Sequence, residues 1–191
     1  MIPELGHFLL IIAAMTALLA PAVVFYGIRR GDDFYAGFSR PASLLTALML
    51  TLSTAALVWA FLTDDFSVAY VANHSNTKLA PAYKAAALWG SHEGSMLLWI
   101  WLMAVGTAGA GFVRCADRLF TARLQGLMLA VLAGFCAFLL FTSNPFLRTL
   151  PMVPPDGRDL NPILQDIGMI LHPPVLFMGY AGLALMFAAM C

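Results

Sequence analysis

Apolar residues gather along the chain in five long runs, which charged or turn-forming residues separate. A helix needs about 20 apolar residues to cross the hydrocarbon core of a bilayer, and each run approaches this length. The runs cover residues 7–27, 42–62, 95–113, 124–142 and 174–191. The pattern therefore predicts an all-α integral membrane protein with about five transmembrane helices.

Basic residues are distributed unevenly among the loops between these runs. The short loops after the first and third runs hold six arginines: Arg29, Arg30, Arg40, Arg114, Arg118 and Arg123. The two longer loops, residues 63–94 and 143–173, hold four basic residues between them. Because positive charge stays on the cytoplasmic side, the N-terminus and both long loops are predicted to lie outside.

The second long loop ends in a segment with helical periodicity. Its apolar residues are Leu160, Ile163, Leu164, Ile167, Ile170 and Leu171, with Gln165 and Asp166 on the other side. This spacing predicts an amphipathic helix on the outer membrane surface, which brings His172 to the interface. Pro173 and Pro174 follow, and Pro174 suits the first turn of the last span.

Composition narrows the class of protein further. Apolar residues make up 61% of the chain and charged residues 10%, and the mean hydropathy of +0.85 exceeds that of soluble domains. The formal net charge is zero and Lys and Arg form no long run, so the sequence has no electrostatic footprint for nucleic acid. Membrane lipid is the expected surrounding.

Most of the polar residues that could take part in a reaction or bind a ligand lie in the outer loops. Residues 89–95, WGSHEGS, combine glycines and serines that predict a tight turn and a helix cap. His92 and Glu93 can move protons or hold a ligand, although the helix dipole alone also favours Glu93 there. His172 has the same two interpretations, ligand or structural residue. Aromatic residues at helix ends are predicted to be interfacial anchors: Trp59, Tyr70, Trp89 and Tyr180.

Four motifs in a fixed order resemble the CcmF/NrfE family of cytochrome c-type biogenesis proteins. They are residues 2–7 (IPELGH), 68–75 (VAYVANHS), 89–99 (WGSHEGSMLLW) and 159–179 (DLNPILQDIGMILHPPVLFMG). The resemblance runs from residue 1 to the end of the chain and does not separate CcmF from its paralogue NrfE. Residues 1–191 are similar to the N-terminal transmembrane part of such a protein.

The resemblance implies a subunit or fragment of the cytochrome c haem lyase. This enzyme joins haem to the CxxCH thiols of apocytochrome c on the outer face of the membrane. His172 matches an outer histidine of the family that handles haem, which makes it the candidate axial ligand, and no other metal is implied. The supporting outer-face residues would be Trp89, Gly90, Glu93, Gly94, Ser95, Asn161, Pro162, Pro173 and Pro174.

The resemblance also implies partners and a location. The partners would be a CcmE-type haem chaperone, CcmH- and CcmI-type proteins and apocytochrome c. The location would be the bacterial inner membrane, with the functional loops facing the periplasm.

The tryptophan-rich WWD haem-binding segment of the family, its second outer histidine and its membrane-embedded histidines are absent from residues 1–191. We therefore expect a fragment that is inactive alone and needs a C-terminal companion chain. The alternatives are a non-catalytic structural membrane subunit and a small transporter component, and spans without embedded charge argue against the second.

Overall fold

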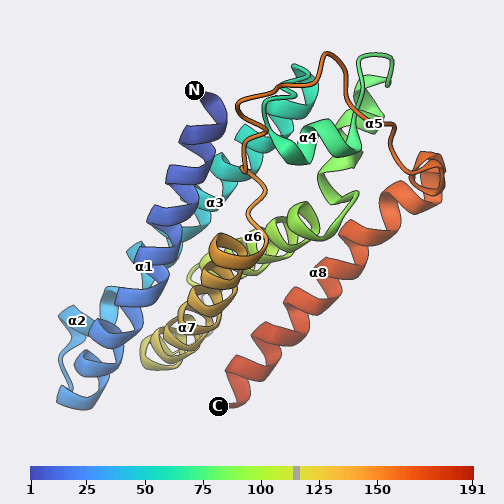
Figure 1. The fold of residues 1–191 in the computed structure, drawn as a ribbon. Coiled ribbons are helices and arrows are strands. Elements are labelled where there is room, and N and C mark those ends of the chain that lie inside the picture. Colours follow the sequence, from blue (N-terminus) through green and yellow to red (C-terminus); the bar gives the residue numbers. More distant parts are fainter. Residues whose placement is uncertain (114–116) are drawn as a thin grey trace.

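The apolar runs form long helices. The computed structural model describes residues 1–113 and 117–191, where each predicted run lies largely within one helix (Figure 1). The long helices are α1 (Ile2–Arg30), α3 (Ser39–Leu62), α6 (His92–Ala110), α7 (Arg118–Thr142) and α8 (Ile167–Met190). The described residues contain one isolated β-bridge and no strand. The all-α prediction is confirmed.

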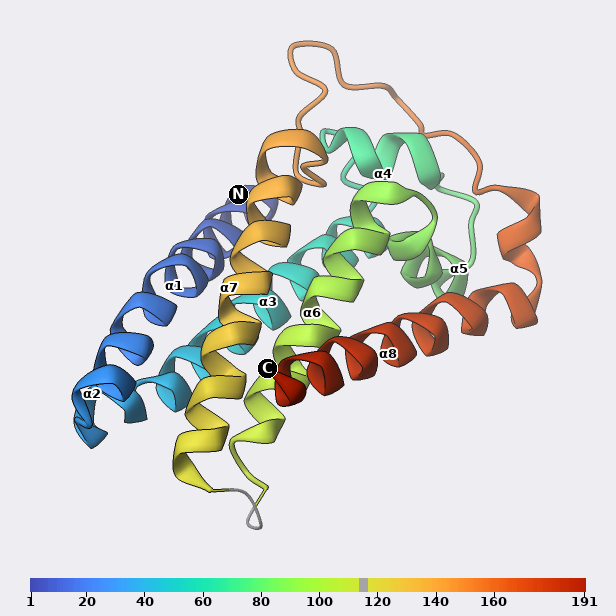
Figure 2. The ribbon, with the colours of Figure 1, turned by 90° about the horizontal axis from the view of Figure 1, so that it is seen from below.

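Short helices lie at the two ends of this bundle (Figures 1 and 2). One end carries α2 (Asp33–Gly37) and the start of α7, and we call it the α2 end. The opposite end carries the N-terminus, residues 143–160 and three short helices, and we call it the motif end. Its short helices are α4 (Ala69–His74), α5 (Pro81–Ala86) and the 3₁₀-helix η1 (Ala87–Trp89).

Four helical segments are long and apolar enough to cross a membrane: Ile2–Arg30, Asp33–Leu62, Arg118–Thr142 and Ile167–Met190. They make the chain a multi-pass membrane protein. The third predicted run, residues 95–113, forms α6, which packs within the bundle but is not among the four. Its glycines, its tryptophans and Glu93 lower its hydropathy. The number of spans and their orientation stay predictions, and Arg114, which supported the orientation, lies outside the described residues.

The prediction of a separate amphipathic helix on the outer surface is wrong. A 3₁₀-helix, η2 (Pro162–Gln165), is followed by α8, which begins at Ile167 and continues through Pro173 and Pro174. The reason is a cap: the Asp166 side chain accepts the N–H groups of Gly168 and Met169, which starts the helix there. Pro174 therefore lies inside α8 and not in its first turn.

Small residues allow the helices to approach closely. α1 packs mainly against α3 and α7, and Ala13, Ala17 and Ala20 are almost fully buried on that side. A Cβ on Gly106 of α6 would lie 2.7 Å from the Leu185 side chain of α8. α8 is the least covered long helix, because only 11% of its most apolar window is buried.

Candidate functional site

Segments that are distant in sequence meet at the motif end. α4, the turn before α6, the N-terminal turn of α1 and residues 143–160 lie together there (Figures 1 and 2). The first three of these segments carry three of the four motifs, and residues 143–160 lead into the fourth. Their contacts show how the chain positions them.

Tyr70 of α4 is the centre of this arrangement. Its side chain is buried, with 4% of the residue surface exposed. Its hydroxyl donates to the Leu88 carbonyl at 3.0 Å and accepts the Ser91 N–H at 3.1 Å. The predicted interfacial role of Tyr70 is therefore wrong, since the hydroxyl ties α4 to the turn before α6 and does not reach the lipid interface.

Gly94 and Ser95 complete this turn, which together with Tyr70 and Leu88 we call the Tyr70 corner. A Cβ on Gly94 would lie 1.7 Å from the Leu88 carbonyl oxygen and 2.6 Å from the Tyr70 hydroxyl. Only glycine therefore fits this position. The Ser95 hydroxyl donates to the Trp89 carbonyl at 3.1 Å. The tight turn predicted for WGSHEGS is confirmed, and Ser91 is the N-cap residue of α6, but the predicted cap by a side chain is wrong, because the Ser91 side chain makes no capping hydrogen bond.

Burial raises the pKa of the Tyr70 phenol above its ordinary value, and the Glu93 charge adds to this effect. The phenol therefore stays protonated at neutral pH. A protonated hydroxyl can donate to one backbone group and accept from another at the same time, as Tyr70 does.

Three buried polar atoms surround the start of α6 without partners. Trp89 Nε1, Glu93 Oε2 and Trp99 Nε1 find no hydrogen-bond partner within residues 1–113 and 117–191. Buried polar atoms are normally paired in proteins, and an unpaired one costs about 1–3 kcal/mol. Three such atoms lie within about three helical turns, so a ligand or a further protein segment that offered them partners would remove this cost.

A groove of about 330 Å³ runs beside these residues between α6 and α8. Its lining is almost entirely apolar, and we call it the aromatic groove; it is formed by His92, Ser95, Met96, Trp99, Phe177 and Tyr180. Trp99 lies nearly parallel to Phe177, with ring centroids 6.5 Å apart, and tilted against Phe135 at 4.8 Å. Such walls suit a flat apolar ligand.

Histidines are the residues here that can bind a metal. His92 lies exposed in the lining of the aromatic groove, and His172 is exposed on α8. The described residues contain no group of three or more His, Cys, Asp or Glu side chains that could hold a metal ion. Any metal bound by an imidazole of these residues would therefore need its other ligands from elsewhere, as haem iron has from its porphyrin.

The second outer loop docks onto the first. The Arg158 N–H donates to the Ala72 carbonyl at 2.7 Å, and a Cβ on Gly157 would lie 2.0 Å from the Ser75 carbonyl oxygen. Leu160 is fully buried, and its Cδ1 would lie 3.3 Å from a Cβ on Gly90. The 68–75, 89–95 and 157–160 segments thus form one packed unit.

Asp156 adds a polar tie between the same two loops. Its carboxylate accepts the backbone N–H of Thr77 at 3.1 Å, the Thr77 hydroxyl at 3.0 Å and the Gly157 N–H at 2.8 Å. The backbone N–H of Thr77, followed by that of Gly157, lowers the pKa of Asp156 below its ordinary value.

The N-terminal motif is joined to the same unit. Arg148 pairs with Glu4 and with Ser67, and Asn144 Nδ2 donates to His7 Nδ1 at 2.9 Å. These contacts tie the first turn of α1 to residues 143–148. The Glu4 and His7 positions of the IPELGH motif therefore have a structural role.

The predicted site residues fall into two groups. Trp89, Gly90, Glu93, Gly94 and Ser95 lie at or beside the Tyr70 corner. The others follow on the chain segment that leads into α8: Asn161, Pro162, His172, Pro173 and Pro174. Asn161 caps η2 by accepting the Ile163 N–H at 3.1 Å.

None of the hydrogen bonds, ring contacts or cavities of the described residues joins His172 to the Tyr70 corner. Two residues that hold the corner together, Tyr70 and Leu160, were missed as site residues by the sequence. Both lie within the motifs at residues 68–75 and 159–179, and this position could have identified them as site residues.

Comparison with known proteins agrees with this arrangement. The cytochrome c assembly protein family model matches residues 89–190, which is more than half of the chain. CcmF of Pseudomonas aeruginosa is 47% identical over 189 residues, and NrfE of Haemophilus influenzae is 44% identical over 189 residues. Each match covers 98% of this chain, but only 29% of the CcmF and 30% of the NrfE.

A solved structure of a cytochrome c haem lyase, CcmF, superposes with a TM-score of 0.82 at 25% identity, covering 98% of this chain and 29% of that one. The chain therefore spans about three-tenths of the length of these relatives. The matches to these relatives cover nearly the whole chain, so they include the Tyr70 corner and α8. This chain belongs to the cytochrome c assembly protein family and is similar to about three-tenths of the length of its CcmF and NrfE relatives.

Proposed function

We propose that the chain acts in cytochrome c maturation, as the part of a CcmF-like haem lyase that helps to receive haem and hold it for attachment to apocytochrome c. The observation that carries the proposal is the packed unit at the motif end. Four motifs shared with the family converge there, beside an aromatic groove and three unpaired polar atoms.

The residues at this end suit haem as a substrate. The aromatic groove offers flat apolar walls and the imidazole of His92, and α8 presents the exposed imidazole of His172. An imidazole nitrogen is an axial ligand that haem iron accepts. Our candidate axial ligand is His172, which the family resemblance favours.

The reaction would be thioether formation. A cysteine thiol of the CxxCH motif adds across a haem vinyl group, so a C–S bond forms at the vinyl carbon next to the ring and the thiol proton ends on the terminal carbon. No net oxidation occurs. Because the reactivity resides in the vinyl group and the thiol, the protein would contribute chiefly by orienting the two substrates.

The proposal includes partners and a side of the membrane. Haem would arrive from a CcmE-type chaperone, and CcmH- and CcmI-type proteins would present the apocytochrome at the motif end, which faces the periplasm of the inner membrane. A companion chain with the remaining family segments would complete the haem site. The chain alone would then be inactive in attachment.

Haem binding in detergent tests the proposal. The chain is purified with and without a companion chain that carries the remaining family segments, and the Soret absorbance is compared for the native sequence, His172→Ala and His92→Ala. His92→Ala tests the competing axial ligand, since the His92 imidazole is also exposed and lines the aromatic groove. We expect a Soret band that needs the companion and His172 but not His92.

Other outcomes would change the assignment. Loss of the band in His92→Ala alone would transfer the axial role to the aromatic groove. No haem and no apocytochrome association under any condition would leave a structural membrane subunit.

A further inference from the structure

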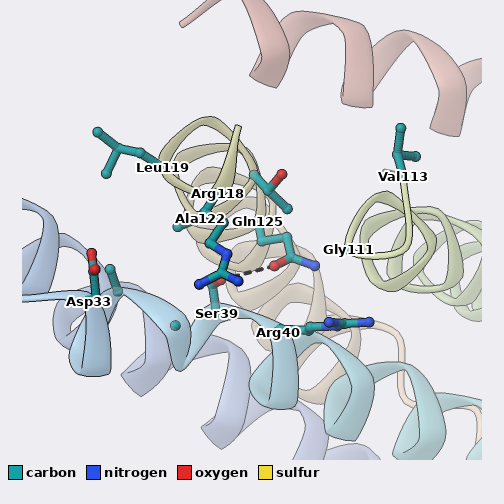
Figure 3. A pocket seen from close by; sticks show the side chains of 12 residues that line it. Asp33, Ser39, Arg40, Gly111, Val113, Arg118, Leu119, Ala122 and Gln125 are labelled. Atoms are coloured by element: carbon teal, nitrogen blue, oxygen red, sulfur yellow. Dashed lines mark hydrogen bonds between the residues drawn. The ribbon is translucent and has the colours of Figure 1, made fainter. Parts of the chain in front are cut away.

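The α2 end carries a pocket that the proposed function does not use. It encloses about 360 Å³ between α2, the start of α3, the end of α6 and the first turns of α7 (Figure 3). Its polar lining residues are Asp33, Ser39, Arg40, Arg118, Thr121 and Gln125. Ser39 and Arg118 are the first residues of α3 and α7, so the pocket lies at the ends of two candidate membrane spans.

The floor of this pocket is rigid. Gln125 is fully buried and Ser39 is 3% exposed. The Ser39 hydroxyl donates to Gln125 Oε1 at 3.0 Å, and Gln125 Nε2 donates to the Thr107 carbonyl at 3.1 Å. These bonds join α3, α6 and α7, so the residues around the pocket are held at fixed positions.

The two arginines of the pocket have no acidic partner within residues 1–113 and 117–191. The ion pairs found among the described residues involve Glu4, Asp64 and Asp65, and Asp33 is not within 4.0 Å of either guanidinium. Figure 3 shows Arg118 directed from α7 toward the Ser39–Gln125 hydrogen bond, with Arg40 next to Ser39 in the first turn of α3. Two arginines against one carboxylate leave the pocket with a net positive charge.

Helix geometry adds to this preference for anions. Asp117 precedes α7 but makes no side-chain cap bond, so the first N–H groups of that helix keep their partial positive charge. Guanidinium groups bind phosphate through paired N–H donors. The pocket therefore suits a phosphate group.

The rim of the pocket indicates where the phosphate comes from. Exposed apolar side chains lie beside the arginines: Val113 and Leu119 line the pocket, and Phe112 contacts Arg40. Arg40 lies 4.9 Å from the ring centre of Phe112, so its charge is held against an apolar surface. Acyl chains could cover these side chains while the headgroup occupies the pocket. We infer that this pocket binds the phosphate headgroup of an anionic phospholipid.

Lipid retention tests the inference. The full chain is equilibrated in mixed micelles with equal amounts of phosphatidylglycerol and phosphatidylcholine, separated from free lipid, and its bound lipids are quantified by mass spectrometry. We expect phosphatidylglycerol to be enriched over the input. Arg40→Gln with Arg118→Gln should lower this enrichment about 25-fold, since each basic residue near an anionic headgroup accounts for about fivefold.

Arg29→Gln with Arg30→Gln is the matched control. It removes the same charge from exposed arginines at the end of α1 and should leave the enrichment nearly unchanged. Equal losses in the two double variants would overturn the inference, because they would show general surface attraction. A native chain without enrichment would overturn it as well.

One further variant and one titration complete the test. Asp33→Asn removes the one carboxylate of the pocket lining and should raise the enrichment, which can be measured even if the double arginine variant fails to fold. Inorganic phosphate is titrated against the lipid-bound chain. Displacement of the lipid by phosphate at matched concentration would mean a site for free phosphate and would overturn the assignment to a lipid.

Discussion

The Tyr70 hydroxyl accepts the backbone N–H of Ser91 at 3.1 Å, across 21 residues of sequence. The same hydroxyl donates to the Leu88 carbonyl at 3.0 Å. One side chain therefore satisfies two backbone groups of the turn that starts α6. The position of His92, Glu93 and the aromatic groove depends on this turn.

Tyr70→Phe should destabilise the chain by about 1–3 kcal/mol, because it leaves a buried N–H and a buried carbonyl without their partner. The free energy of unfolding in detergent, followed by far-UV circular dichroism, measures the loss. Tyr35→Phe is the control, since Tyr35 is exposed and its hydroxyl makes no hydrogen bond among the described residues. Equal stability of the two variants would contradict the role of Tyr70.

Gly94→Ala should cost about 3 kcal/mol, because its methyl group would lie 1.7 Å from the Leu88 carbonyl oxygen and the backbone must move. Gly109→Ala in the same helix is the control. No atom lies within 4 Å of a Cβ at Gly109, so alanine should stabilise the helix there by about 0.5–1 kcal/mol. Thermal unfolding of the two variants in one detergent compares them directly, and a tolerated Gly94→Ala would refute the close packing.

Lys84→Met should destabilise the motif end by about 3 kcal/mol. Lys84 is 6% exposed and its Nζ lies 2.6 Å from the Asp64 carboxylate, so its loss leaves a partly buried charge unpaired. Adding Asp64→Asn should recover part of the stability, since a neutral amide costs less to leave unpaired.

A double-mutant cycle on the free energy of unfolding measures this coupling. Lys78→Ala is the surface control and should change stability by less than about 0.5 kcal/mol. Strictly additive effects of the Lys84 and Asp64 substitutions would mean that the pair does not act as a unit.

The tie between the two outer loops should weaken in acid. The pKa of Asp156 is lowered in the folded chain, so its contribution is present above the unfolded pKa of about 4 and is lost as the pH falls through the folded value. Amide hydrogen exchange at Thr77 should accelerate over this range, after correction for the intrinsic pH dependence of exchange. In Asp156→Asn the acid-dependent step should be absent, and its persistence would assign the step to another group.

The sequence by itself determined the helical architecture. Hydropathy and helix length are local properties, so five apolar runs were enough to predict the long helices and a membrane location. Glycines and serines in residues 89–95 were enough to predict a turn and a helix start, because few other residues allow such a backbone. The family motifs indicated which loops carry the candidate site.

The tertiary structure decided which residues hold that end together. Tyr70 looked like an interfacial anchor, and its role depends on backbone groups of a distant turn. Pro173 and Pro174 predicted that the last helix begins there. α8 begins at Ile167 instead, because the Asp166 side chain caps it. Hydrogen bonds and pockets depend on the relative positions of segments that hydropathy does not encode, so only the packed bundle could reveal them.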